Sequence, residues 1–213
     1  MKKRNLMLLS AIAAASILMT GCGFTADDPA DSQAVTITPE PTATPAPTAT
    51  PAPTVTPTAN LNNDMWRIFG VLFFNDKDYF LNPTRKAFCR ERIIDFLNEK
   101  GIALFDTASS VRRLQDNASD KFLEVVEATD IAAMLRRLPE CKAIVTTGQK
   151  ATDTLRQQLD VEEPKVGDYS EFVFEKRAIR LYRMPSSSRA YPLALDKKAA
   201  AYRIMYQDLQ LLP

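Results

Sequence analysis

The chain has 213 residues, 46% of them hydrophobic and 25% charged, with 27 Lys and Arg against 26 Asp and Glu. This composition is that of an ordinary globular protein, and a net charge of +1 gives no general attraction to nucleic acid or to a membrane. The absence of histidine excludes Ser-His-Asp catalysis, Cys-His catalysis and His-ligated zinc. The three cysteines form no Cys-x-x-Cys pair, so we expect no metal and no cofactor.

The first 22 residues have the pattern of an export signal. A basic start is followed by an apolar run from Leu6 to Met19, which is short for a transmembrane helix and suits a signal-peptide core. The ending Met19-Thr20-Gly21-Cys22 resembles a lipobox, in which the cysteine is lipidated and becomes the new N-terminus. We therefore predict a lipoprotein signal peptide over 1–22 and a membrane anchor at Cys22, with an ordinary cleaved signal peptide as the alternative.

A spacer follows the signal. Half of the chain's 14 prolines lie between Pro39 and Pro57, interleaved with Thr and Ala. Such a segment cannot bury a core and favours extended conformations. We predict a disordered linker over 23–61 and one globular domain over 62–213.

The first half of the globular part begins with the dense apolar segment 63–74, which predicts a helix or a buried segment. A second helix is expected from Pro83 to a C-terminal stop at Gly101, followed by a strand over 102–107. Ser119 is expected to cap a helix that carries Phe122 to Val126.

The second half continues the alternation of strands and helices. Thr129-Asp130 is expected to start a helix that ends before Pro139, and 141–159 reads as strand, Gly-containing turn and helix. Residues 171–184 predict two strands around a short turn, and 193–212 a closing helix. This order predicts an α/β sandwich with a short, mostly parallel sheet and with function at the C-terminal ends of its strands. Three loops therefore stand out, at Asp106, at 146–149 and at 184–188.

Four segments, in this order, resemble the uracil-DNA glycosylase superfamily, in particular its branch of hypoxanthine and mismatch-type glycosylases. They are NNDMW (62–66), GIALFDTASSVRRLQDNASDKF (101–122), IVTTGQKA (144–151) and LYRMPSSSRAYPLALDKK (181–198). The resemblance covers about Asn63 to Leu212. It implies a three-layer sandwich and an enzyme that flips a deaminated base, uracil or hypoxanthine, out of DNA and hydrolyses its N-glycosidic bond.

The resemblance also implies roles for individual residues. Asn63 matches the catalytic or water-positioning Asn, although capping of the next helix is the structural alternative. The other residues implied to contact DNA or the base are Gly148, Gln149, Pro185, Ser186, Ser187, Ser188, Arg189 and Tyr191. Tyr191 or Leu193 is expected to act as a wedge in the base stack. Trp66 and Phe69 are expected in the core, and Arg112 and Arg136 on solvated faces.

The sequence departs from the family at its start. The family begins with a central strand and a Gly-x-x-Pro loop, and this piece is absent upstream of Asn63. We therefore expect a sheet that lacks its first strand, with unpaired backbone groups on both neighbours. The alternative to the enzyme is a non-enzymatic, lipid-anchored binding protein with a degenerate glycosylase fold. Expected partners are DNA if the chain is active and a membrane through Cys22; a chimeric or mispredicted gene start would instead make the protein cytoplasmic. The oligomeric state is left open.

Overall fold

The structure is a computed structural model, and it describes residues 5–10, 61–113 and 123–213. The segment holding Cys22 and the Pro/Thr spacer lies outside the described residues. The described helices are α1 (Met65–Phe74), α2 (Arg90–Lys100), α3 (Ile131–Arg137), α4 (Gln149–Arg156) and α5 (Leu195–Asp208). The described strands are β1 (Asn5–Ser10), β2 (Ile102–Asp106), β3 (Ala108–Arg113), β4 (Leu123–Ala128), β5 (Cys141–Thr147), β6 (Asp168–Phe174) and β7 (Arg177–Met184).

The main sheet has five strands in the order β2-β1-β5-β7-β6. Strands β2, β1, β5 and β7 run parallel, and β6 joins the edge as the antiparallel partner of β7. The class predicted from the alternating pattern, α/β with a mostly parallel sheet, is confirmed at this level.

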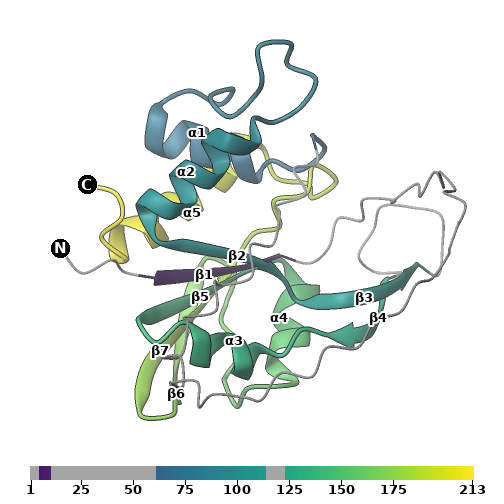
Figure 1. Cartoon of the computed structure of the whole chain (residues 1–213), viewed down its shortest axis with the longest axis vertical. Helices are drawn as coiled ribbons and strands as arrows, with labels where there is room; N and C mark the ends of the chain where they lie inside the picture. The colour runs from purple at the N-terminus through teal and green to yellow at the C-terminus, as the bar shows by residue number, and fades with distance from the viewer. Residues whose placement is uncertain (1–4, 11–60, 114–122) are drawn as a thin grey trace, which may run out of the picture. The chain divides into compact units, whose positions relative to one another are not determined.

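The expectation of a missing strand is corrected by β1. Asn5–Ser10 lies between β2 and β5, with Leu6 opposite Ile102 on one side and opposite Ala143 on the other (Figure 1). A parallel sheet needs a partner at this place, because otherwise both neighbours would present unpaired N–H and C=O groups. A short apolar strand from the start of the chain provides that partner. The same residues belong to the segment predicted as a signal-peptide core.

Helices cover both faces of the sheet, with α1, α2 and α5 on one face and α3 and α4 on the other (Figure 1). The alternation of side chains along β5 explains why both faces are apolar. Ala143 and Val145 join the core with α1, α2 and α5, whereas Ile144 joins the core with α3 and α4. Strands that are buried on both faces contain continuous apolar runs, such as Ala-Ile-Val at 143–145 of this strand.

The core of the first face is aromatic. Trp66 and Phe69 are 3% and 0% exposed, so their predicted place in the core is confirmed. Phe69 packs edge-on against Tyr206 of α5, with ring centroids 5.8 Å apart. This contact holds α1 against α5.

Helix α2 ends at the predicted position, but it starts later in the chain than the sequence predicts. Gly101 is in the left-handed conformation, with a φ of 66°, as a glycine C-cap requires. The helix begins at Arg90 and not at Pro83, because the side chain of Asn82 accepts hydrogen bonds from Thr84, Lys86 and Ala87. These bonds hold the segment in a loop.

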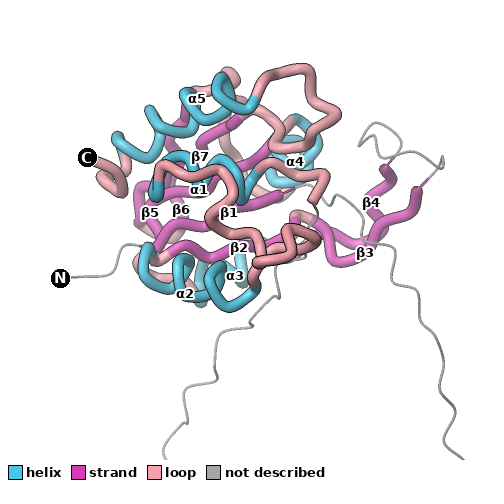
Figure 2. Tube along the Cα trace, turned by 90° about the horizontal axis from the view of Figure 1, so that it is seen from above, coloured by secondary structure: helices cyan, strands magenta, loops and turns pink. Residues whose placement is uncertain are grey.

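The predicted helix after Ser119 is wrong over its described part. Leu123–Ala128 forms β4, which pairs antiparallel with β3 as a hairpin that projects from the main sheet (Figure 2). The segment Leu-Glu-Val-Val-Glu-Ala contains two adjacent β-branched valines, which favour a strand. The predicted cap Ser119 lies outside the described residues.

The closing elements follow the sequence closely. Strands β6 and β7 form the expected hairpin, with Glu175 and Lys176 in the turn at positive φ. Arg112 and Arg136 are exposed, as expected. Within the described ranges, no helix is long and apolar enough to span a membrane.

Candidate functional site

The candidate site lies where the parallel strands end. In the sheet register, Ser10 of β1 is opposite both Asp106 of β2 and Thr147 of β5, and Thr147 is opposite Met184 of β7. The residues that follow these strand ends therefore emerge along one edge of the sheet. In open parallel sheets, this is the edge at which ligands bind.

Two of the loops singled out in the sequence meet at Gly148. Its N–H donates to the carbonyl of Met184 at 3.1 Å, and its φ is 99°. A Cβ at this position would lie 3.3 Å from the Cβ of Ser186. Only glycine combines this backbone conformation with so close an approach to the 184–188 loop.

The segment that precedes α1 packs against the same loop. The N–H of Asp64 donates to the carbonyl of Ser187 at 2.7 Å, and the N–H of Arg189 donates to the carbonyl of Asn62 at 3.1 Å. Asn63 forms an isolated antiparallel bridge with Ser188. Asn63, Gly148 and the 185–189 loop, which the sequence singles out separately, thus form one contiguous site.

The side chain of Asn63 is predicted either to act on a ligand or to cap the next helix, and its geometry allows both. Its Oδ1 accepts a hydrogen bond from the N–H of Met65 at 2.9 Å, so it does cap the first turn of α1. The residue is only partly buried. Because Oδ1 is directed at the helix, the Nδ2 amide is the group of Asn63 that can donate to a ligand.

The serine loop is built as two successive turns. The Oγ atoms of Ser186 and Ser188 each accept a backbone hydrogen bond at 3.2 Å, from Ser188 and from Ala190. Both serines are partly exposed, whereas Ser187 is 2% exposed. The carbonyl of Pro185 accepts from the hydroxyl of Tyr202 at 3.0 Å, which fixes the loop to α5. Ser186 and Ser188 can therefore donate outward, and Ser187 is part of the interior.

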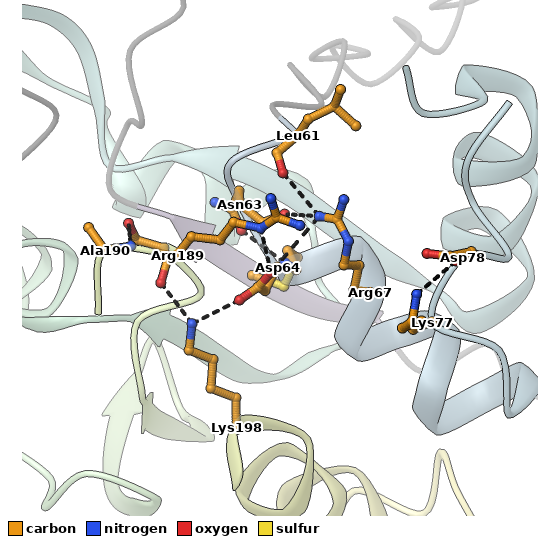
Figure 3. Close-up of polar contacts among 11 residues, drawn as sticks. Leu61, Asn63, Asp64, Arg67, Lys77, Asp78, Arg189, Ala190 and Lys198 are labelled. Atoms are coloured by element: carbon orange, nitrogen blue, oxygen red, sulfur yellow. Dashed lines mark hydrogen bonds and ion pairs between the residues drawn. The ribbon is translucent and has the colours of Figure 1, made fainter. Parts of the chain in front are cut away.

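A cluster of charges underlies this loop (Figure 3). The carboxylate of Asp64 receives Lys198 at 3.0 Å and Arg189 at 3.2 Å, with Arg67 at 3.9 Å. Lys198 also donates to the carbonyl of Ser188 at 2.7 Å. Three cations around one carboxylate leave excess positive charge at the edge of the sheet.

The exposure of these cations separates their roles. The side chain of Lys198 is 1% exposed and that of Arg67 is 11% exposed, so both hold the loop and α1 in place. The side chain of Arg189 is 48% exposed and remains accessible to an anionic ligand. Arg189 is thus the solvent-accessible cation of this cluster, and the other two cations are buried beneath it.

Of the remaining predicted residues, Gln149 has a structural side chain and Tyr191 has an accessible one. The side chain of Gln149 donates to Asp153 and Glu163 and accepts from Arg183, so it is engaged in a local network at the start of α4. Tyr191 is 37% exposed and its N–H donates to the carbonyl of Ser188. Tyr191 therefore stands at the rim of the site, while the Gln149 side chain supports α4.

Three groups at this edge were missed as individual residues. The sequence singles out the loop that begins at Asp106 but not its carboxyl, whose pKa burial raises to about 6. An acidic residue at the end of an apolar strand was the available signal. Asp64 and Lys198 form a buried pair, and no sequence pattern joins two residues 134 positions apart.

Comparison with known proteins gives no assignment: no protein-family model matches the chain, and no curated protein matches it at a significant level. The family implied by the sequence motifs stays a prediction.

Proposed function

We propose that this chain is a DNA glycosylase of the uracil-DNA glycosylase type, which excises a deaminated base, uracil or hypoxanthine. The reaction breaks the bond between the deoxyribose C1′ and the base nitrogen, and water adds to C1′. The products are the free base and an abasic site. Such a reaction requires neither a metal nor a histidine, provided that the site stabilises charge and positions a water molecule.

One observation carries the proposal. At the C-terminal edge of the parallel sheet, Asn63 forms a backbone bridge with Ser188, and Gly148 packs closely against Ser186 of the same loop. Helices on both faces of that sheet suit the three-layer sandwich of the superfamily. Strand β1 then stands at the place of the family's first strand.

Asn63 has the geometry to bind a base. Its Oδ1 is held by Met65, so its Nδ2 is available to donate to a carbonyl oxygen such as those of uracil or hypoxanthine. A donor to that oxygen stabilises the negative charge that develops on the leaving base. Removal of one donor to a developing oxyanion typically costs a factor of about 10²–10³ in rate.

The phosphates would be bound by the neighbouring loop. Ser186 and Ser188 can donate hydrogen bonds at short range, and Arg189 provides an accessible positive charge. Such contacts position DNA without reading its sequence. Tyr191, at the rim, is suited to fill the space that a flipped nucleotide leaves in the stack.

Asp106 is the candidate for placing the water. With a pKa of about 6, its carboxyl is largely ionised at neutral pH and still basic enough to accept a proton from water. An anion at this edge also favours the positive charge that develops on the sugar.

The test is base excision by the full chain, because the sheet includes Asn5–Ser10. Single-stranded and duplex oligonucleotides carrying one uracil or one hypoxanthine are incubated with the protein, and abasic sites are cleaved with alkali. We expect product from at least one substrate. Asn63→Asp keeps an Oδ acceptor for the Met65 N–H and removes the amide donor, so we expect it to remain folded and to lose activity by about 10²-fold or more.

Arg136→Ala is the matched control, because Arg136 is exposed and pairs with Glu175 in the turn before β7, at the end of that strand away from the site. It should leave excision unchanged. If the wild-type protein unfolds cooperatively and yet excises neither base, the enzyme proposal is wrong. The non-enzymatic binding protein would then be the better description.

A further inference from the structure

Strand β1 finds both of its sheet partners in a distant part of the chain. It pairs in parallel with β2 from Leu6 to Ser10 and with β5 from Asn5 to Ser10. Residues 11–60 lie between this strand and the rest of the globular unit in sequence. β1 is therefore an isolated six-residue segment whose described partners all come from a distant part of the chain.

Without β1, β2 and β5 would border an open slot. Neighbouring strands lie about 4.8 Å apart, so β2 and β5 are separated by roughly 10 Å and cannot pair directly without a rearrangement. Each would present a row of unpaired backbone groups toward the other. Such a slot is complementary to one extended apolar segment, as in complexes in which a peptide adds a strand to a sheet.

We propose that the slot between β2 and β5 is a strand-binding groove, and that Asn5–Ser10 of the same chain is its separable occupant. The register fixes the direction and the position of the bound strand, with Leu8 opposite Leu104 and Val145. Because the strand and the groove belong to one chain, their pairing is intramolecular, which favours it over exchange between copies.

The test uses the full chain with a protease recognition sequence inserted between Thr48 and Ala49, in the spacer. After cleavage, fragments 1–48 and 49–213 are passed over a size-exclusion column. We expect them to elute together as a one-to-one complex. A fluorescent peptide of residues 3–12 should exchange into the complex when added in excess and displace fragment 1–48.

Leu8→Pro tests the groove, because proline in the middle of a central strand removes a ladder hydrogen bond on the strand. In the cleaved protein we expect this variant to abolish co-elution. Ile17→Pro is the matched control, since it alters the same apolar run outside β1, and it should leave co-elution intact.

Two results would overturn the proposal. One is that 49–213 elutes alone, as a folded monomer whose amide protection in β2 and β5 equals that of the uncleaved chain. The other is that Leu8→Pro co-elutes as well as the wild type does. Aggregation or unfolding of 49–213 on loss of fragment 1–48 would support it. None of these readouts depends on glycosylase activity.

Discussion

Lys198 of α5 donates a hydrogen bond to Asp64 at 3.0 Å, and through this buried pair the last helix is joined to the start of the first one. Lys198 also holds the carbonyl of Ser188. One side chain thus fixes two of the segments that form the candidate site, the start of α1 and the serine loop. The pair explains how a loop of small polar residues is kept in a single conformation.

Replacing Lys198 should therefore destabilise the fold and the site together. Lys198→Met leaves the buried carboxylate of Asp64 with less compensation, although Arg189 and Arg67 remain near it. Loss of one member of a buried ion pair typically costs 3–5 kcal/mol, and we expect about 3 kcal/mol here in urea unfolding. Lys197→Ala, at the exposed neighbouring position, should change the free energy of unfolding by less than about 0.5 kcal/mol.

A double-mutant cycle measures the interaction of the pair, and it requires Asp64→Asn, Lys198→Met and the double variant Asp64→Asn/Lys198→Met. Removing both charges should recover part of the loss, because no uncompensated carboxylate is then buried. Equal stabilities for the single and double variants would show that the pair contributes little.

Gly148 should be intolerant of any side chain. Gly148→Ala adds a Cβ 3.3 Å from Ser186 at a backbone φ of 99°, so we expect a loss of about 1–3 kcal/mol and a displaced serine loop. Gly167→Ala is a close control, because Gly167 has a φ of 88° and no atom within 4 Å of the added Cβ. Both variants should lose stability in thermal unfolding, but only Gly148→Ala should lose base excision as well.

Asp106 should make stability depend on pH. Burial raises its pKa from 3.8 to about 6, so the folded state binds this proton more tightly than the unfolded state does. The carboxyl therefore destabilises the fold progressively as pH rises from about 4 to about 6, and fully above that range. Asp106→Asn should stabilise the protein by roughly 2–3 kcal/mol at pH 7.5 and by little near pH 4.

Urea unfolding of both proteins at the two pH values measures this difference. An equal gain at pH 4 and pH 7.5 would mean that ionisation of Asp106 is not its source. If the proposed function holds, the same variant should excise bases more slowly despite its higher stability, as is common for a strained catalytic group.

Arg189 should contribute to DNA binding and little to the fold. Its side chain is half exposed, so Arg189→Ala should leave unfolding nearly unchanged. Binding to a single-stranded oligonucleotide should weaken, and the slope of log K against log salt should fall by about 1. Arg203→Ala, at an exposed position of α5, should leave the slope unaltered.

Local patterns were sufficient to predict much of this fold. The glycine stop at 101 and the two strands expected over 171–184 follow from short-range signals that tertiary packing does not oppose. The segment 63–74, expected as a helix or a buried segment, forms α1. The 146–149 and 184–188 loops could be grouped before their contact was known, because the C-terminal ends of parallel strands meet at one edge of the sheet. Asn63 joins them only through the family resemblance.

The failures concern segments whose state depends on distant partners. Leu123–Ala128 carries spacing that suits a helix as well as a strand, and only its pairing with β3 decides between them. The place of Asn5–Ser10 in the sheet could not be predicted, because a central strand and a signal-peptide core both need a short apolar run. The signal peptide itself stays a prediction. The ion pair of Asp64 with Lys198 leaves no periodic trace in the sequence.

The sequence positions of the sheet's strands also set an order of events during synthesis. Strand β1 leaves the ribosome first, yet its partner β5 follows more than a hundred residues later. At 5–20 residues per second, the ribosome needs roughly 7–27 s to reach that point. Throughout this interval Asn5–Ser10 lacks its partner β5, and it lacks β2 as well until that earlier strand has been synthesised. The sheet can therefore be completed only after β5 has been synthesised, although one of its central strands is the first to be made.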